Sequence, residues 1–190
     1  MKLLEDRIKL CGKVLPGNVL KVDSFLNNQI DVALLVEMGK EIYNHFKDCS
    51  VNKIVTIESS GIGLACITAQ FFNCKVVFAR KSKSSNMSND VYSSTAYSYT
   101  HKTTNNVIIS KEYLTKDDNV LLIDDFLANG EATKALIDLI NQAGATLKGV
   151  AIAVEKGFQG GGDKLREQGV DLLSLAIVDK MDENGITFRS

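Results

Sequence analysis

The sequence lacks the features that usually hold small secreted domains or zinc sites together. Its four cysteines include no Cys-x-x-Cys pair, only two histidines could join them in a metal site, and Pro16 is the single proline. Unpaired cysteines of this kind are typically small apolar residues buried in proteins of a reducing cytosol. We therefore expect free, buried thiols and no zinc site.

Long hydrophobic runs and an excess of one charge are also missing. No apolar run reaches about 18 residues, so we expect neither a membrane span nor a signal peptide. The 22 basic and 23 acidic residues give a net charge of -1, which is unlike a basic nucleic-acid-binding chain. The expectation is a single cytoplasmic domain over residues 1–190, with no nucleic-acid or membrane partner.

What is present is a regular alternation of strands and helices. Runs of β-branched apolar residues, typical of strands covered on both faces, lie at 53–58, 75–80, 119–125 and 149–156. Helical spacing of apolar residues predicts helices over 31–47, 61–72 and 129–144, with Asp31 capping the first. This order predicts an α/β fold, a central parallel sheet flanked by helices. The first 30 residues and the chain after residue 170 are expected to build the remaining cover.

One segment departs from this pattern. Residues 80–105 are rich in Ser, Asn, Thr and Lys and poor in aliphatic side chains, and the apolar run NNVIIS follows them. A disordered insertion is one interpretation. We favour a long, mobile hairpin over about 81–105, because long loops of this kind are often active-site lids. Three tyrosines are candidates to touch substrate, or simply to pack within the hairpin: Tyr92, Tyr97 and Tyr99.

Two glycine-containing stretches need to be tested as phosphate loops. GFQGGGDK (157–164) has Asp163 where a Walker A motif has lysine, and no Ser or Thr follows Lys164, so we expect a flexible turn. ESSGIG (58–63) is neither GxGxxG nor the GxSxG elbow of hydrolases. Its position between a strand and a helix favours a turn whose backbone N–H groups face an anion.

The stretch VLLIDDFLANGEAT (120–133) is the most informative. Its strand ends on Asp124 and Asp125, a pair that costs solvation free energy unless it meets a cation or a hydroxyl-rich ligand. Free N–H groups at the following helix N-terminus, supported by the Thr133 hydroxyl, would cradle a monophosphate, and Gly130 would let the backbone approach it. This spacing suits a ribose 5-phosphate. An ordinary strand–turn–helix with surface acids is the alternative.

This stretch resembles the phosphoribosyl pyrophosphate (PRPP) signature of type I phosphoribosyltransferases: an apolar run, two acids, two apolar residues, small residues and glycine. TIESSGIG stands in the place of the family's pyrophosphate loop. VVFARKSK resembles the basic segment of the adenine-type branch, with Lys83 one place short of the third basic residue. VLKVDSFLNNQID and DDFLANG are most similar to the xanthine-using branch. The resemblance covers nearly the whole chain and implies the family's fold, with a small hood and a hairpin lid.

The activity that the resemblance implies is purine salvage. A pentosyltransferase of this kind would transfer the 5-phosphoribosyl group of PRPP to xanthine, giving xanthosine 5'-monophosphate and pyrophosphate. Mg²⁺ would accompany PRPP without an assigned protein ligand, and the protein would be a homodimer. Two alternatives stay open: another purine (guanine, hypoxanthine or adenine), or a non-catalytic PRPP-sensing regulator. Such regulators usually add a DNA-binding domain, for which the chain has no spare length.

Three sets of site residues follow from the resemblance. The catalytic acids would be Asp124 and Asp125, placed to accept from the ribose hydroxyls near the developing sugar cation. PRPP would be bound by Ala128, Asn129, Gly130, Glu131 and Ala132 at the phosphate and by Arg80, Lys81 and Lys83 at the pyrophosphate. Xanthine would be bound by Leu20, Asn27 and Lys156.

The residue types at the base site suit a 6-oxopurine. The Lys156 ammonium can donate to a 6-oxo group but cannot accept from a 6-amino group. Asn27 offers a donor and an acceptor to the 2-oxo edge, and Phe158 could stack on the ring. Ala128 stands where hypoxanthine–guanine enzymes carry the proposed base. The acceptor of the purine proton therefore stays open, with solvent or Glu58 as candidates.

Overall fold

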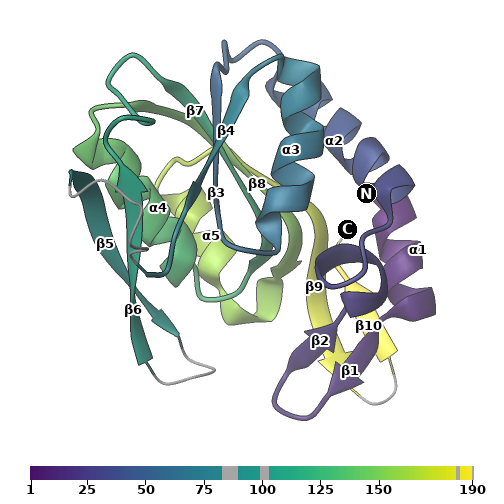
Figure 1. Ribbon diagram of the computed structural model, residues 1–190. Coiled ribbons are helices and arrows are strands. Elements are labelled where there is room, and N and C mark those ends of the chain that lie inside the picture. Colours follow the sequence, from purple (N-terminus) through teal and green to yellow (C-terminus); the bar gives the residue numbers. More distant parts are fainter. Residues whose placement is uncertain (83–89, 99–102, 183–184, 190) are drawn as a thin grey trace.

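The computed structural model describes residues 1–82, 90–98, 103–182 and 185–189 (Figure 1). Its core is a six-stranded sheet in the order β10-β9-β8-β7-β3-β4. The strands are β3 (Lys53–Ile57), β4 (Lys75–Ala79), β7 (Asn119–Leu127), β8 (Thr146–Lys156), β9 (Leu172–Asp182) and β10 (Gly185–Phe188). All neighbours pair in parallel except β9 and β10, which are antiparallel. The predicted parallel sheet is therefore mixed at one edge.

Helices cover both faces of the sheet, as the alternation predicts (Figure 1). One face carries α1 (Lys2–Cys11), α2 (Val32–Phe46) and α3 (Gly61–Phe72), and the other carries α4 (Glu131–Gln142) and α5 (Gly161–Glu167). Side chains of β7 alternate between these two cores: Leu121 and Ile123 enter the first, Val120 and Leu122 the second. The predicted cap is confirmed, because Asp31 accepts from the Leu34 N–H at 3.1 Å.

The chain after residue 170 does more than cover the sheet. The apolar run that begins at Leu172 pairs along β8 as β9, and β10 turns back against it. Helix α5 makes the crossover between β8 and β9, so the last strands extend the core itself. The run LLSLAIV has the apolar content of the strands that were predicted, so a strand could have been expected here as well.

Two hairpins extend beyond the same end of the sheet, one on each side (Figure 1). The first pairs β1 (Lys13–Leu15) with β2 (Val19–Lys21) and leads into a π-helical turn, η1 (Asp23–Asn27). The second pairs β5 (Val91–Ser98) with β6 (Thr103–Ser110), so a hairpin lies in this region, but its second strand includes the NNVIIS run that was expected to follow it. Gln142 of α4 donates to the Ser93 carbonyl at 2.9 Å and ties this hairpin to the core.

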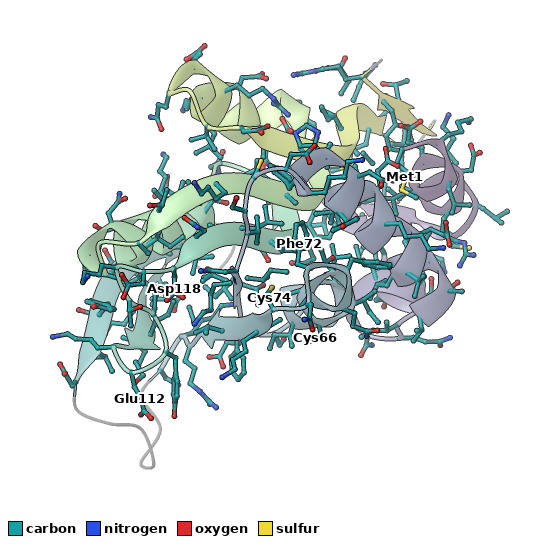
Figure 2. The ribbon with its side chains drawn as sticks, turned by 90° about the horizontal axis from the view of Figure 1, so that it is seen from above. Met1, Cys66, Phe72, Cys74, Glu112 and Asp118 are labelled. Carbon is teal, nitrogen blue, oxygen red and sulfur yellow. The ribbon has the colours of Figure 1, made fainter. Side chains whose placement is uncertain are left out.

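The cysteines are free, as expected, but they are not all buried. Cys11, Cys49 and Cys74 are half-buried, and Cys66 is exposed on the outer side of α3 (Figure 2). Burial raises the pKa of the Cys74 thiol. Within the described ranges, no helix has both the length and the apolar composition needed to cross a membrane.

Candidate active site

The predicted phosphate loop is a tight turn between a strand and a helix. β7 ends at Leu127 and α4 begins at Glu131, so only three residues connect them. Gly130 occupies the helix N-cap with φ +87°, a conformation that glycine adopts without steric cost. Because Gly130 has no side chain, it cannot cap the first turn of α4. The N–H groups of that turn are left to solvent or to an anion.

A cleft of about 510 Å³ opens at this loop. It contains all five predicted phosphate-loop residues, Ala128, Asn129, Gly130, Glu131 and Ala132, together with Thr133. Lys156 at the end of β8 lines it from the core, Tyr97 from the β5–β6 hairpin, and the turn at 17–19 from the β1–β2 hairpin. This volume lies in the range of small-molecule sites. The sequence predicted Lys156 and the phosphate loop separately, and the fold brings them together.

The two acids lie on β7 just before the loop. Asp124 is only 5% exposed, and Asp125 is half-buried. Burial, followed by the charge of Asp125, raises the pKa of Asp124 well above its usual range. The Asp125 N–H donates to Asp124 Oδ1 at 2.9 Å. Neither acid is among the residues that line the 510 Å³ cleft, so a ribose that contacts them would have to reach beyond that lining.

The predicted pyrophosphate loop lies against the acids. A Cβ atom at Gly61 would be 2.9 Å from Asp124 Oδ1 and 2.5 Å from the Thr56 hydroxyl, so only glycine fits there. Glu58 accepts from the Lys81 N–H at 2.6 Å, and the peptide between Glu58 and Ser59 is cis. The strand-to-helix turn is therefore packed beside Asp124, and its role as a pyrophosphate loop stays a prediction.

The structure separates the predicted basic residues. Lys81 lies close enough to the acids that its positive charge offsets a part of the rise in the Asp124 pKa. Arg80 instead pairs its backbone with Ile108 and places its guanidinium 5.2 Å from the Phe78 ring, in a second cleft of about 560 Å³. Neighbours on an extended chain point to opposite sides, which explains the separation. Lys83 and Tyr99 lie outside the described residues.

Of the predicted base-binding residues, only Lys156 lines the cleft. Its ammonium donates to the Asn18 carbonyl at 2.9 Å, lies 5.7 Å from the Phe126 ring, and has a pKa lowered by burial. Leu20 is buried in the core on the α1–α3 face of the sheet, and Asn27 is exposed at the end of η1. Phe158 is exposed as well. Neither Leu20 nor Asn27 reaches the cleft in this structure.

The turn after Lys156 corrects an expectation. Instead of a flexible turn, residues 157–164 form a 3-10 turn, η2 (Gly157–Gln159), and the start of α5, with Gly161 and Gly162 buried. Gln159 lines the cleft, and its Oε1 atom is buried without a hydrogen-bond partner in the described part of the chain. Sequence reasoning missed Gln159 and Asn18. The only available signal was that Gln159 follows Lys156 closely.

Comparison with known proteins identifies this arrangement. Residues 21–180 match the family described as "Phosphoribosyl transferase domain". The chain belongs to the phosphoribosyltransferase family. It is 59% identical to the xanthine phosphoribosyltransferase of Bifidobacterium adolescentis and 54% identical to xanthine phosphoribosyltransferase 2 of Clostridium botulinum. Both alignments cover 100% of this chain and 100% of the relative.

Solved structures confirm the type I phosphoribosyltransferase fold. An APRTase from Giardia lamblia in complex with 9-deazaadenine superposes with a TM-score of 0.79 at 26% identity, covering 94% of this chain and 98% of that one. The adenine phosphoribosyltransferase of Trypanosoma brucei gives the same TM-score at 19% identity, covering 96% and 82%. The mixed sheet of this phosphoribosyltransferase, flanked by helices, is thus the expected architecture of the family.

Proposed function

We propose that this phosphoribosyltransferase transfers the 5-phosphoribosyl group of PRPP to xanthine, releasing pyrophosphate and forming xanthosine 5'-monophosphate. The observation that carries the proposal is the cleft in which a lysine ammonium faces a helix N-terminal phosphate loop. Whole-length identity above 50% to proteins named xanthine phosphoribosyltransferase supports it. The reaction is a purine salvage step of the pentosyltransferase class.

The chemistry assigns a role to each part of the site. The purine nitrogen forms a bond to the anomeric carbon as the bond from that carbon to pyrophosphate breaks, so positive charge develops on the sugar. Asp124 and Asp125 would accept from the ribose hydroxyls and stabilise that charge. The N–H groups of residues 128–132 would hold the 5-phosphate. Of the predicted basic residues that the structure describes, Lys81 is the one near the acids, and its ammonium would offset charge on the leaving pyrophosphate.

Lys156 favours an oxopurine over adenine. An ammonium group has three donors and no acceptor, so it can bond a 6-oxo oxygen but would leave the 6-amino group of adenine without a partner. This matters because the structural relatives described above are adenine enzymes. The similarity to these enzymes therefore concerns the fold alone. Side chains such as Lys156 would determine which purine is used. Leu20 and Asn27 stay predicted base contacts that would require movement of the first hairpin.

Mg²⁺ fits this site as a companion of PRPP. Among the described residues, no group of three or more His, Cys, Asp or Glu side chains could hold a metal ion by itself. Carboxylate oxygens of Asp124 and Asp125 are nevertheless of the hard type that Mg²⁺ prefers, and this cation usually keeps substrate phosphates among its ligands. Bound with PRPP, it would neutralise charge on the pyrophosphate.

Two features of the assembly complete the proposal. The β5–β6 hairpin, with the neighbouring residues from about 81, would act as a lid, because Tyr97 already lines the cleft. A cytoplasmic homodimer is what the family implies. The second cleft, beside edge strand β4, supports a contact between two copies because it exposes Phe78 (38%) and Tyr113 (55%). A single domain over residues 1–190 would carry the whole activity.

A purine panel tests the proposed reaction. The purified protein is incubated with PRPP, Mg²⁺ and xanthine, guanine, hypoxanthine or adenine, and both pyrophosphate and nucleotide are measured. We expect xanthine to give the highest kcat/KM and adenine none above background. Preferred use of guanine or adenine would overturn the choice of base. PRPP binding without turnover of any purine would instead indicate a regulator.

A further inference from the structure

Glu155 is a buried carboxylate that the reaction does not use. It has no exposed surface, and it accepts from both terminal nitrogens of Arg166 at 3.0 and 2.7 Å and from the Ser174 hydroxyl. Successive strand residues point to opposite faces, so Glu155 lies on the far side of the sheet from Lys156. Its charge is thus fully paired by α5 and β9 and unavailable to substrate.

Two glycines fill the space between this carboxylate and the phosphate loop. A Cβ atom at Gly162 would lie 2.1 Å from Glu155 Oε1. A Cβ atom at Gly161 would lie 2.2 Å from the Ala128 carbonyl oxygen and 2.8 Å from the Gly130 nitrogen. The Gly161 N–H also donates to the Ala128 carbonyl at 3.2 Å. The start of α5 is therefore in backbone contact with the phosphate loop on one side and with Glu155 on the other.

We propose that Glu155, Arg166, Gly161 and Gly162 form a positioning wedge that sets the phosphate loop at a fixed distance from Lys156. None of these four residues lines the 510 Å³ cleft. Glu155 adjoins Lys156 in the chain, and Gly161 bears on Ala128, so one rigid unit spans the base end and the phosphate end of the cleft. The purine, which accepts the ribosyl group, and the 5-phosphate of PRPP would then be held at the separation that the reaction needs.

The bidentate geometry is what makes the pair suited to this role. A planar guanidinium fork fixes both the direction and the distance of a carboxylate, whereas an ammonium group acts as a single point charge. The pair also need not be there for stability, because buried ion pairs often contribute little beyond what an apolar pair would. Geometry, rather than added stability, is therefore the property that the wedge supplies.

The central test is Gly161→Ala, which introduces a methyl group against loop backbone rather than against a flexible side chain. The matched control is Gly169→Ala, at the other end of α5, where no atom lies within 4 Å of the new Cβ although φ is +80°. Displacement of the loop should raise the PRPP KM about tenfold or more and lower kcat, while the control stays within about twofold. Thermal unfolding is measured for both.

A second variant separates positioning from stability. Arg166→Lys keeps the positive charge beside Glu155 but loses the two-point geometry, so the wedge predicts a raised PRPP KM whether or not Tm falls with the lost hydrogen bond. A purely structural pair instead predicts a lowered Tm with an unchanged KM, and that result overturns the proposal. If Gly161→Ala does not fold, Arg166→Lys decides by the same two measurements.

The wedge rests on the proposed role of residues 128–132, so Gly130→Val is assayed alongside. A raised PRPP KM in Gly130→Val with unchanged values in Gly161→Ala and Arg166→Lys rejects the wedge and keeps the phosphate loop. Unchanged values in all three variants reject the phosphate loop as well. A raised PRPP KM in all three variants, with the Gly169→Ala control near wild type, supports both the wedge and the phosphate loop.

Discussion

Asp124 is the last of five consecutive buried residues in β7, and the pKa of its carboxyl group is raised by burial and then by the charge of Asp125. Such a group binds more protons in the folded than in the unfolded protein. The folded state therefore loses stability as pH rises from the ordinary carboxyl pKa through the raised one, and the loss is complete above it. The residue proposed to stabilise the sugar cation thus lowers the stability of the free protein.

Replacing this carboxyl group should raise stability and lower activity together. Asp124→Asn removes the ionisable group but keeps an oxygen that can accept from the Asp125 N–H. We expect a Tm above that of wild type at about pH 8, with the difference shrinking toward about pH 5. We also expect kcat/KM to fall by about 100-fold or more. Calorimetry without ligand across this pH range checks the first part, and a variant less stable than wild type at the upper end contradicts it.

Lys156 is the residue on which we propose that the choice of base depends. Its burial lowers the pKa, but its hydrogen bond to the Asn18 carbonyl shows that a carbonyl oxygen is an acceptable partner. A 6-oxo group could replace that carbonyl, since both are acceptors. Under the proposed assignment, the first hairpin would hold the lysine until an oxopurine takes the place of the Asn18 carbonyl.

Removing the donor should affect xanthine and spare PRPP. Lys156→Met keeps much of the side-chain volume, and we expect kcat/KM for xanthine to fall by about 30- to 1000-fold, about 2–4 kcal/mol, with little change in PRPP affinity. Lys164→Met, at an exposed position of α5, is the control for loss of a lysine charge. Full xanthine activity in the Lys156 variant would show that the base binds elsewhere.

At the scale of elements, the β7–α4 connection depends on the backbone conformation of one residue. The nearest atoms to a Cβ built at Gly130 are 3.8 Å away, so space is available there, but φ is +87°. A β-branched side chain strongly disfavours that conformation. Substitution should therefore change the shape of the loop without forcing the core apart.

Gly130→Val tests this connection. We expect the PRPP KM to rise about tenfold or more, with a near-native circular dichroism spectrum, because the first-turn N–H groups no longer converge on the phosphate. Gly169→Val places the same side chain at φ +80° in open space and controls for backbone strain alone. Equal PRPP KM values in the two variants would mean that the 5-phosphate binds elsewhere.

The β5–β6 hairpin is the element expected to respond to substrate. Its base is held by the bridge between Arg80 and Ile108 and by the bond from Gln142 to Ser93, whereas Tyr97 lines the cleft. Closure over PRPP would exclude water from an activated sugar. Amide exchange over 91–98 and 103–110 should slow when PRPP and Mg²⁺ are added. Equal protection with and without ligand would remove the lid from the proposal.

At the scale of the whole molecule, edge strand β4 is where a second copy is expected. The second cleft lies beside it and combines exposed aromatic rings with Lys53, Lys75 and Arg80. Sedimentation analysis should give a dimer of twice 20.8 kDa at micromolar concentration. Phe78→Asp, which places a charge in this face, should shift the protein toward the monomer. A monomeric wild type, or a variant that dimerises equally well, contradicts the assignment.

The sequence by itself determined the order of the elements and the local shape of the site. Helical spacing of apolar residues located α3 at residues 61–72, and continuous β-branched apolar runs located the cores of β3, β4, β7 and β8, because a strand covered on both faces is apolar at every position. The acids, Gly130 and the start of α4 are neighbours in the chain, so their arrangement is local as well. Lys156 was found by resemblance and by its place at a strand end.

Only the tertiary structure decided which contacts form between segments that are distant in the chain. No local pattern indicates that Gly161 bears on Ala128 or that Lys156 bonds the Asn18 carbonyl. The same holds for Asn27, which the resemblance placed at the base and the fold leaves exposed. Such contacts join residues far apart in sequence, and their geometry follows from how whole layers pack, which the periodicity of a single segment does not contain.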